Sequence, residues 1–344
     1  MKEKTVIIGM SGGVDSSVAA LLLKQQGYTV IGATMQLLDN EETKKSIEDA
    51  KEIAKILDIK HYVWDFRKEF KDQIINHFIS SYQNGQTPNP CVICNKKFKF
   101  GLFYQKAREL GVTYIATGHY AKVENNHLVM SNVDGKDQSY FLCQIEKEVL
   151  PHILFPLNQY KSKDEIRQIA QENKLPVSMK KDSQEICFIP NDDYKAFLQN
   201  KIKFLPGNII LKDQTILGKH QGLYQYTIGQ RKGLNISYKE PLYVIELDTK
   251  NNNLIVGSNN DLMKKVLTAS HMNYLTEKED LTKYPIYAKI RSRGTEEEVE
   301  NIKENEENTL TITFKNPIRA ITPGQFIVFY NNKKECLGGA YIIK

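Results

Sequence analysis

Residues 10–17 read M-S-G-G-V-D-S-S, and this stretch decides the fold. The β-branched run Thr5–Gly9 precedes it and predicts a buried strand, whereas Ser16–Gln26 follows it and predicts a helix that ends at Gly27. A strand, a glycine turn and a helix in that order bring unpaired backbone N–H groups and a helix N-terminus to one point. The stretch therefore predicts an anion-binding site.

The residue types in this loop suit an anion. Gly12 and Gly13 carry no Cβ, so the backbone can approach a ligand closely. Hydroxyl donors are supplied by Ser11, Ser16 and Ser17. A tight strand-to-helix turn with Asp15 as the N-cap is the simpler alternative. The sequence of this loop does not follow the G-x-x-x-x-G-K-[ST] pattern of a Walker A loop.

Composition places the chain among ordinary globular proteins, and 344 residues suggest two or three domains. The formal net charge of +6 is modest. Its distribution favours an anionic partner, although a solvated lysine-rich surface explains the charge equally well. The basic residues in or beside the motifs are Lys96, Lys97, Lys181, Arg231 and Lys232.

The apolar runs of the sequence are too short for a membrane span, and the start M-K-E-K leads directly into the first strand. We therefore expect a cytoplasmic protein without a membrane partner. Five cysteines make an odd number, which argues against a secreted disulfide framework. In a reducing compartment the cysteines need a catalytic, metal-binding or packing explanation.

Strand and helix patterns alternate through the first part of the chain. Tyr28–Met35 and His61–Trp64 predict strands, and Glu41–Leu57 and Phe66–Tyr82 predict helices. This alternation predicts an α/β fold with a doubly wound, Rossmann-like parallel sheet and helices on both faces. Ligands of such sheets bind beyond the carboxyl ends of the strands. Val112–Tyr120 predicts a further strand of this kind, which runs into a loop at the same edge.

A cysteine motif follows the predicted helix Phe66–Tyr82. Thr87–Pro90 contains two prolines and predicts a rigid loop, and Lys96–Leu110 predicts a helix. Cys94 should then lie near a helix N-terminus and beside Lys96 and Lys97. Both features favour the thiolate over the thiol, so we expect a reactive cysteine.

The C-x-x-C spacing of Cys91 and Cys94 suits a redox pair, two metal ligands or a buried structural pair. A second C-x-x-C is missing from the sequence, which argues against a closed zinc site. Cys187 lies in a short apolar strand or turn. Cys143 and Cys336 lie in apolar runs, where we expect them to pack.

The pattern becomes all-β after about Phe204. We expect a small central β-rich domain and a C-terminal β-barrel, with domain boundaries at 1–203, 204–265 and 266–344. Two basic segments there, Tyr226–Leu234 and Lys289–Arg293, either meet phosphates or form solvated faces. The acidic stretch Glu296–Glu307 predicts a loop at a hairpin tip.

Seven segments, in order along almost the whole chain, resemble one family. They are G-M-S-G-G-V-D-S-S (9–17), T-P-N-P-C-x-x-C-N-K (87–96), A-T-G-H-Y-A (116–121), K-D-Q-S-Y-F-L (136–142), D-S-Q-E-I-C-F-I (182–189), Y-T-I-G-Q-R-K-G-L (226–234) and P-G-Q (323–325). The chain resembles the tRNA-specific 2-thiouridylases, which belong to the N-type ATP pyrophosphatase (PP-loop) superfamily. The opening motif alone also fits argininosuccinate, GMP and asparagine synthetases, which the cysteine segments do not suit.

This resemblance implies an enzyme, a tRNA-uridine 2-sulfurtransferase. Such an enzyme uses ATP and Mg²⁺ to adenylate O2 of the wobble uridine, position 34, in the anticodon stem-loop of tRNA. Sulfur from a cysteine persulfide then replaces the activated oxygen, and the products are 2-thiouridine, AMP and pyrophosphate. The implied partners are tRNA and a sulfur-donor protein such as a cysteine desulfurase or a sulfur-relay protein.

The resemblance also assigns residues. Cys187 receives the persulfide, and Cys94 is the nucleophile that either attacks the persulfide or forms a disulfide with Cys187 after transfer. Asp15 helps to hold Mg²⁺. The positions that match ATP contacts are Gly9, Met10, Ser11, Gly12, Gly13, Val14, Asp15, Ser16, Met35 and Gly118. Those that match tRNA contacts are Asn89, Pro90, Cys91, His119, Lys136, Asp137, Gln138, Arg291, Ser292 and Gln325.

Two positions depart from the family pattern. Cys91 stands where the family commonly has Asp, so Cys91, Cys94 and Cys187 could together hold a 4Fe–4S cluster with an open iron. Such a cluster would be an alternative route for the same thiolation. Ser292 stands where an aromatic residue is expected, which weakens that tRNA contact. Two other classes remain alternatives: a small-molecule adenylating ligase and a non-catalytic RNA-binding protein.

Overall fold

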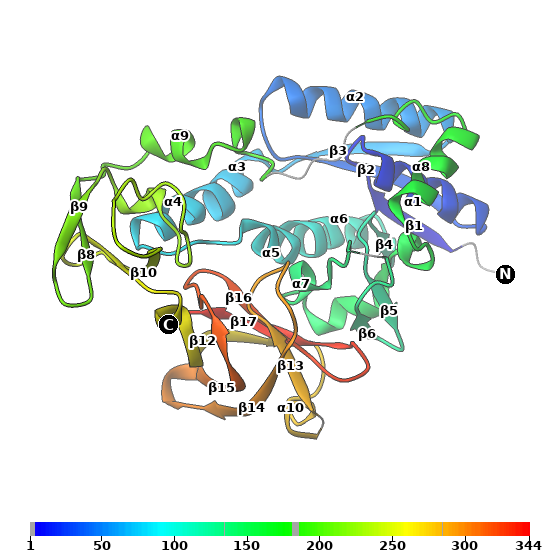
Figure 1. Ribbon diagram of the computed structural model, residues 1–344. Coiled ribbons are helices and arrows are strands. Elements are labelled where there is room, and N and C mark those ends of the chain that lie inside the picture. Colours follow the sequence, from blue (N-terminus) through cyan, green and yellow to red (C-terminus); the bar gives the residue numbers. More distant parts are fainter. Residues whose placement is uncertain (1–3, 134, 181–185, 284) are drawn as a thin grey trace.

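The structure is a computed structural model that describes residues 4–133, 135–180, 186–283 and 285–344. Lys181 and the first four residues of the segment 182–189 lie outside the described residues. Figure 1 shows three parts: an α/β part, a small β-rich part and a barrel. Among the described residues no helix combines the length and the apolar character needed to cross a membrane.

A five-stranded sheet forms the centre of the α/β part. Its strands pair in parallel in the order β3-β2-β1-β4-β7. They are β1 (Thr5–Gly9), β2 (Thr29–Gln36), β3 (Lys60–Asp65), β4 (Tyr114–Ala116) and β7 (Ile153–Leu154). The doubly wound parallel sheet predicted from the alternating pattern is confirmed. The predicted strand Val112–Tyr120 shrinks to β4, and its C-terminal part forms a loop.

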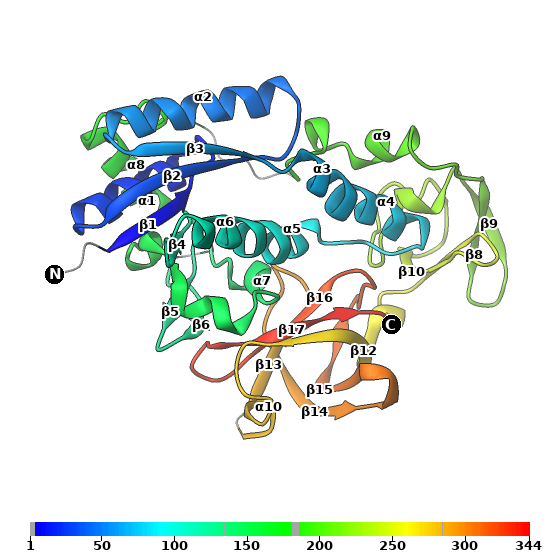
Figure 2. The same ribbon diagram turned by 180° about the vertical axis from the view of Figure 1, so that it is seen from behind.

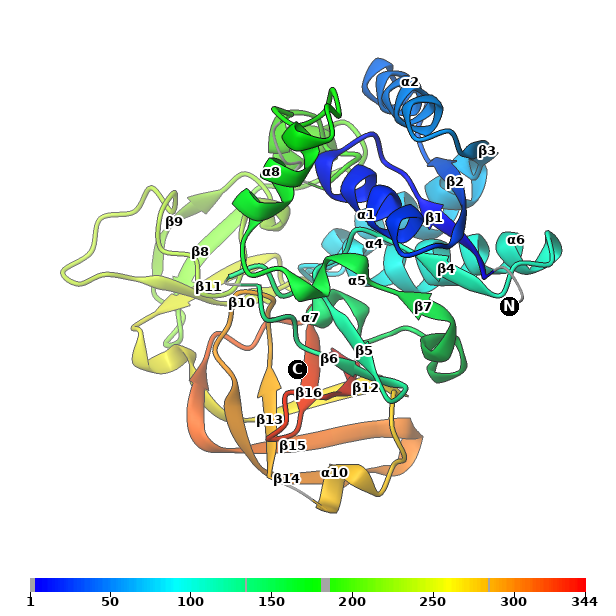
Figure 3. The ribbon, with the colours of Figure 1, turned by 90° about the vertical axis from the view of Figure 1, so that its right-hand side faces the viewer.

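Helices cover both faces of the sheet, as Figure 3 shows. Val6 and Ile8 of β1 pack in one cluster with α1 (Val14–Gln25), α2 (Glu41–Ile56) and α8 (Lys163–Glu172). Ile7, which points the other way, packs with Phe103 at the start of α6 (Phe103–Glu109). Because successive side chains of a strand point to opposite faces, a continuous apolar run is the expected pattern for a strand covered on both sides.

The cysteine motif opens a long helix. It begins as α5 (Pro90–Cys94), continues as the π-helical stretch η2 (Asn95–Leu102) and ends as α6. The prediction that Pro90 belongs to the preceding loop is wrong. Proline suits the first turn of a helix, because an N–H group at that position would have no acceptor within the helix. A second helical arm, with an aromatic core, is formed by α3 (Arg67–Phe70), η1 (Lys71–Ile75) and α4 (Asn76–Gln83).

The middle part is a four-stranded sheet with the order β10-β11-β8-β9. Its strands are β8 (Gly207–Leu211), β9 (Ile216–His220), β10 (Tyr243–Asp248) and β11 (Asn253–Gly257). The short helix α9 (Tyr194–Gln199) leads into it, and a separate apolar cluster forms its core. A small central β-rich part was expected from the change of pattern near Phe204, and the sheet confirms it.

The last part is a closed barrel in the order β12-β15-β14-β13-β16-β17. Figure 2 shows it beneath helices α5 and α6, with α7 (Ser139–Leu142) between them. The barrel strands are β12 (Met263–Tyr274), β13 (Ile286–Lys289), β14 (Glu297–Glu304), β15 (Thr309–Arg319), β16 (Phe326–Tyr330) and β17 (Cys336–Ile342). The short elements β5 (Lys122–Glu124), β6 (His127–Val129) and α10 (Asp280–Lys283) lie on its side of the molecule. The predicted C-terminal β-barrel is confirmed.

One barrel strand has an acidic sequence. The stretch Glu296–Glu307 was expected to be a loop, but most of it is β14, with Val299 and Ile302 packed against the barrel core. Its glutamates form ion pairs with lysines of β12, of β15 and of the segment after β12. The pairs are Lys265–Glu300 at 2.9 Å, Lys315–Glu298 at 2.9 Å and Lys278–Glu304 at 2.5 Å. Charged residues on an exposed strand face thus hide the alternation that reveals a strand.

Candidate active site

The loop after β1 joins directly to α1. Gly13 is the N-cap of this helix and has an extended backbone, and its carbonyl accepts hydrogen bonds from the hydroxyls of Ser17 (2.8 Å) and Ser16 (3.2 Å). The backbone N–H of Ser11 donates to Ser16 Oγ at 3.2 Å. Asp15 lies in the first helical turn, so the alternative in which it caps the helix is wrong.

The two glycines of the loop have different surroundings. Gly12 has a φ of +64°, and a Cβ there would lie 2.4 Å from the carbonyl oxygen of Ser46 in α2. Gly13 has a φ of −105°, and a Cβ there would meet only Ser11 Oγ, at 3.4 Å. Gly12 is therefore required by the fold, whereas Gly13 borders open space at a helix N-terminus, where an anion would bind.

Two lysines that the sequence interpretation missed lie at this loop. Lys163, at the start of α8, donates to Asp15 Oδ1 at 2.6 Å, and Tyr120 donates to the same oxygen at 2.6 Å. Lys180 donates to the carbonyl of Gly12 at 2.9 Å. Neither lysine belongs to a recognisable motif, and only folding brings α8 to the loop. Both lysines form ion pairs in this structure, Lys163 with Asp15 and Lys180 with Asp49 at 2.7 Å, and their ammonium groups are the kind of donor that a polyphosphate binds.

Asp15 offers the kind of ligand that Mg²⁺ prefers. Its carboxylate side chain keeps 30% of its surface exposed beside the loop. Magnesium commonly uses one or two carboxylates together with substrate phosphate oxygens. The residues present therefore fit a magnesium ion that arrives with a bound nucleotide.

The other predicted nucleotide contacts surround the same loop. A Cβ on Gly118 would lie 2.9 Å from Ser16 N, so only glycine lets the loop after β4 approach α1 this closely. Met35 lies at the end of β2 and is partly buried against the aromatic side chains of the second helical arm. Met10 and Val14 are buried, so they can contribute only backbone groups to a ligand.

Three cysteines come close together near the start of the long helix that opens with α5. Cys94 is buried, Cys91 and Cys187 are exposed, and all three are free thiols. Cys94 shares an aromatic cluster with Phe188, whose ring packs edge-on to Phe70 with centroids 5.9 Å apart. The structure therefore brings the segment around Cys187 to the helix that carries Cys94.

The expectation of a Cys94 thiolate is wrong for this state of the protein. Burial raises the pKa of the Cys94 thiol to about 12, and the neighbouring thiols of Cys187 and Cys91 add to the shift. Although part of Cys187 is exposed, the protein atoms packed around its thiol desolvate it and raise its pKa to about 11. Lys96, which was expected to favour the Cys94 thiolate, donates a hydrogen bond to Gln144 Oε1 at 3.3 Å. The loss of solvation raises the pKa of the Cys94 thiol by more than the nearby helix N-terminus lowers it. Deprotonation of Cys94 therefore needs a further change, such as substrate binding.

A third missed lysine, Lys99, opposes this shift. Its charge lowers the pKa of Cys91, Cys94 and Cys187, although burial outweighs it at each. Lys99 follows Cys94 by five residues, which in an α-helix would separate them by about 140° around the axis. The π-helical stretch η2 instead has i→i+5 hydrogen bonds, which align residues five apart. No pattern in the sequence signals this change of period.

Lys99 also contacts His119. Its Nζ lies 3.3 Å from His119 Nε2, and Thr117 Oγ1 lies 2.7 Å from Nδ1. Burial, together with the charge of Lys99, holds the pKa of His119 well below its usual value. The ring is therefore neutral and accepts at Nε2. His119 is only 8% exposed, so the structure places this predicted tRNA contact inside the protein.

The cysteines do not form a metal site in this structure. Among the described residues, which include Cys91, Cys94 and Cys187, no group of three or more His, Cys, Asp or Glu side chains is arranged to hold a metal ion. The residues as folded do not fit a 4Fe–4S cluster, which needs three thiolates at bonding distance.

Several predicted tRNA contacts hold loops in place. The backbone of Tyr120 exchanges two hydrogen bonds of 2.9 Å with the backbone and side chain of Gln138. Asp137 accepts from Ser131 N at 2.9 Å and from Ser139 Oγ at 2.8 Å. Lys136, beside them, is partly exposed. These residues order the loops beside the glycine loop that precedes α1.

The remaining predicted tRNA contacts lie on the barrel and on the loop before α5. Arg291 is exposed and donates to the carbonyl of Arg319 at 3.2 Å, and Ser292 is partly exposed. Gln325 Nε2 donates to the carbonyl of Thr87 at 2.8 Å. Asn89 is partly exposed, and Pro90 is buried.

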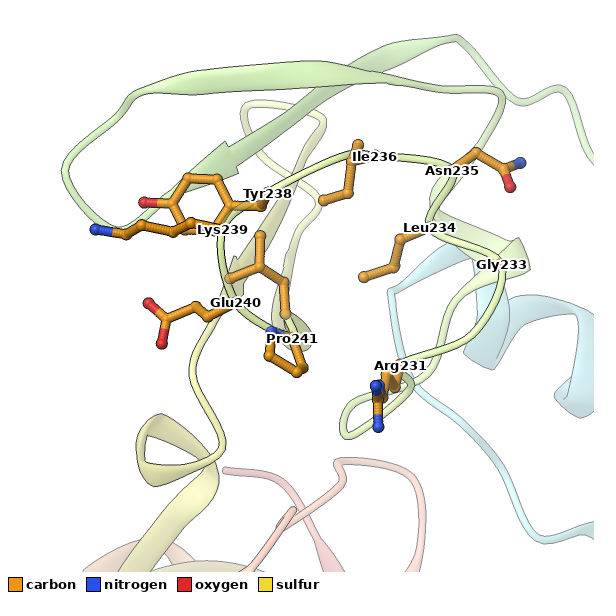
Figure 4. Close-up of a pocket in the computed structure, with 10 residues that line it drawn as sticks. Arg231, Gly233, Leu234, Asn235, Ile236, Tyr238, Lys239, Glu240 and Pro241 are labelled. Carbon is orange, nitrogen blue, oxygen red and sulfur yellow. The ribbon is translucent and has the colours of Figure 1, made fainter.

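The basic loop of the middle part borders an open hollow. Figure 4 shows Arg231 on one side of it and Lys239 and Glu240 on the other, with Tyr238 beside Lys239. The hollow carries both signs of charge and a 37%-exposed tyrosine. These groups suit a large polar partner better than an enclosed small molecule.

Comparison with known proteins covers each part of the chain. Residues 4–191 match the profile of the tRNA methyl transferase HUP domain. Residues 195–258 match the tRNA methyl transferase PRC-barrel domain, and residues 264–342 match the aminomethyltransferase beta-barrel domain.

Relatives align over nearly the full length. The chain is 46% identical to the tRNA-specific 2-thiouridylase MnmA 2 of Thermoanaerobacter sp. (strain X514), over 98% of this chain and 97% of that protein. It is 44% identical to the tRNA-specific 2-thiouridylase MnmA 1 of Fusobacterium nucleatum, over 98% and 92%. Among solved structures, the U34-tRNA thiolase NcsA of Methanococcus maripaludis covers 50% of this chain and 56% of its own, with 17% identity and a TM-score of 0.33. A likeness that weak carries no inference about the site.

Proposed function

The chain belongs to the family of tRNA-specific 2-thiouridylases, and from this premise we propose how its residues convert the wobble uridine of tRNA to 2-thiouridine. As a member of that family it is a tRNA-uridine 2-sulfurtransferase, a nucleotide-binding transferase that modifies tRNA. The observation that carries the proposal is the pairing of a phosphate-binding loop with two cysteines, Cys94 and Cys187, that are distant in sequence and adjacent in the fold.

The first step activates the base. Uridine O2 attacks the α-phosphate of ATP, and pyrophosphate leaves into the loop, where the N-terminal N–H groups of α1 stabilise it. Lys163 and Lys180 supply positive charge at the same place. Asp15 would hold Mg²⁺, which when bound neutralises charge on the phosphates. The ribose and adenine would lie toward Met35 and Gly118, beyond the strand ends.

The second step transfers sulfur. A donor protein loads the exposed Cys187 as a persulfide, whose terminal sulfur attacks C2 of the adenylated uridine and expels AMP. Cys94 then attacks Sγ of Cys187, which breaks the S–S bond and leaves 2-thiouridine and a Cys94–Cys187 disulfide. The sulfane sulfur gains two electrons and the two thiols lose them, so an external thiol reductant must reopen the disulfide. In the alternative order, Cys94 attacks first and releases sulfide.

Nucleoside mass spectrometry tests this function. Unmodified tRNA with uridine at the wobble position is incubated with the protein, ATP, Mg²⁺ and a persulfide donor, and a matched transcript with cytidine at that position is the control. We expect 2-thiouridine only in the uridine transcript, together with AMP. No 2-thiouridine would overturn the proposal, and AMP formed without tRNA would indicate a small-molecule ligase instead.

We expect Lys99 to control the reactivity of Cys187. Lys99→Gln removes the charge that lowers the pKa of this thiol, so less thiolate exists at any pH below about 11. Alkylation of Cys187 by iodoacetamide, followed by peptide mass spectrometry between pH 7 and 9, should slow by about twofold to tenfold, where tenfold equals one pKa unit.

Matched variants separate charge from structure. Lys99→Arg keeps the charge and should alkylate at nearly the original rate. Lys97→Gln removes an exposed charge from the same π-helical stretch and should have little effect. Equal alkylation rates in Lys99→Gln and the unmodified protein would show that Lys99 does not act on this thiol.

A further inference from the structure

The loop that leads into α5 is held by the barrel. Thr87 donates its backbone N–H to the carbonyl of Pro323 at 2.9 Å, and its own carbonyl accepts from Gln325 Nε2 at 2.8 Å. Both bonds come from the turn Pro323–Gln325, which precedes β16. Both backbone hydrogen-bonding groups of Thr87, in the α/β part, are therefore bonded to one turn of the barrel.

Gly324 makes this grip possible. It has a φ of +97°, a backbone conformation that favours glycine, and a Cβ there would lie 2.7 Å from the carbonyl oxygen of Thr87 and 2.8 Å from its nitrogen. The turn itself is anchored to β17, because Gly324 N donates to the carbonyl of Ile342 at 3.0 Å and Ile342 N donates to that of Gln325 at 2.9 Å. The backbones of Gly324 and Thr87 are therefore in direct contact, and a side chain at residue 324 would not fit between them.

The anchoring continues on both sides of the turn. Tyr341 of β17 donates to Gln86 Oε1 at 3.1 Å. Tyr140 of α7 donates to the carbonyl of Phe326 at 2.9 Å, and Phe326 N donates back to the tyrosine oxygen at 3.3 Å. Tyr140 and Phe326 are buried. The turn is consequently fixed to the α/β part independently of its contact with Thr87.

The chain between Thr87 and Cys91 is stiff. Two of its three residues, Pro88 and Pro90, are prolines with fixed φ, and each also restricts the residue before it. Pro90 is the first residue of α5, and Cys91 follows it. A displacement of Thr87 is therefore transmitted to the start of the helix that carries Cys91 and Cys94, because the two prolines leave few dihedrals to absorb it.

We propose that Gln325 is a positioning residue: through its hydrogen bond to Thr87, the turn Pro323–Gln325 of the barrel sets the position of the loop before α5 and hence of the cysteine helix. The amide group of Gln325 holds this loop in the protein without tRNA. Its effect on thiolation rests on the proposed function, but its effect on the loop does not.

Hydrogen exchange of the free protein tests the inference. Gln325→Glu keeps the size of the side chain but removes the N–H donor, so residues 84–95 should exchange about threefold to tenfold faster than in the unmodified protein, as expected for the loss of one hydrogen bond. Thr322→Val is the matched control, because Thr322 Oγ1 donates only within its own turn, to the carbonyl of Ala320 at 2.9 Å. Its exchange in residues 84–95 should stay unchanged.

Measurements with tRNA then distinguish positioning from direct contact. We expect Gln325→Glu to lower kcat for thiolation by about tenfold. We expect the tRNA dissociation constant of Gln325→Ala, which adds no negative charge, to change less than twofold. Unchanged exchange in residues 84–95 of Gln325→Glu would overturn the inference, and a weakened tRNA affinity of Gln325→Ala alongside it would assign Gln325 to tRNA contact alone. Because the exchange experiment contains neither ATP nor tRNA, its outcome does not depend on the reaction.

Discussion

Replacing Cys187 by serine should abolish 2-thiouridine formation, while tRNA-dependent release of pyrophosphate continues and the AMP stays bonded to uridine O2. A hydroxyl cannot carry a transferable sulfur, so the loss of thiolation should exceed about 10³-fold, as for other covalent nucleophiles. Adenylation depends on the phosphate-binding loop, which the substitution does not touch. Nucleoside mass spectrometry measures the thiolation, and a coupled pyrophosphate assay measures the adenylation.

Cys94→Ser should give a different intermediate. With the attacking thiol removed and without ATP or tRNA, Cys187 should remain loaded with the donor sulfur after the donor protein is removed, and peptide mass spectrometry should detect the added sulfur. Cys143→Ala and Cys336→Ala are the controls, since both cysteines are buried away from this site and packed in the interface between α7 and the barrel. Full thiolation by Cys187→Ser or Cys94→Ser would contradict the persulfide route.

Cys91 decides between the two sulfur routes. On the persulfide route, Cys91→Asp introduces the residue that the family resemblance predicts at this position and should leave thiolation within about threefold of normal, the range of context-dependent effects at an exposed position. On the cluster route it removes a ligand and should abolish both iron binding and activity. Anaerobic purification with iron and acid-labile sulfide analysis provides the second readout: an active protein without iron supports the persulfide route.

The parallel sheet could be predicted because its strands are continuous β-branched runs that alternate with amphipathic helices. The run Thr5–Gly9 needs no tertiary knowledge to be assigned, since a strand covered on both faces is apolar throughout. Strand β14 could not be predicted in the same way, because cross-strand lysines neutralise its glutamates only in the folded barrel. The local sequence pattern thus predicts which strands are buried, but it does not reveal ion pairs between residues that are distant in the sequence.

The candidate site shows the same division. The glycine loop and the cysteines carry recognisable spacing, so both were found before the fold was known. Lys163 and Lys180 were missed because they reach the loop only through the packing of α8 and the chain after it. Lys99 was missed because a π-helical stretch changes the helical period, and the state of Cys94 was predicted wrongly because burial cannot be judged from neighbouring lysines.

The two glycines of the phosphate-binding loop should separate folding from nucleotide binding. Gly12→Ala places a Cβ against the Ser46 carbonyl at a residue with a φ of +64°. A left-handed backbone costs a non-glycine residue about 1–2 kcal/mol, which corresponds to a fall of about 2–8 °C in the unfolding temperature before the clash is counted. Calorimetry without ATP should detect this fall.

Gly13→Ala should behave in the opposite way. Its φ of −105° suits alanine, and its Cβ would meet only Ser11 Oγ at 3.4 Å, so the unfolding temperature without ATP should stay within about 1 °C of normal. The added methyl group would instead occupy space where the proposed pyrophosphate lies against the helix N-terminus, and a displacement of about 1 Å there should slow tRNA-dependent AMP formation by about 10²-fold. A stable Gly13→Ala variant with normal AMP formation would show that the phosphates do not bind against this residue. The turn itself needs glycine only at residue 12. If Gly13→Ala is normally stable without ATP but slow in forming AMP, glycine at residue 13 is needed for the ligand, which is the property of a ligand-binding loop.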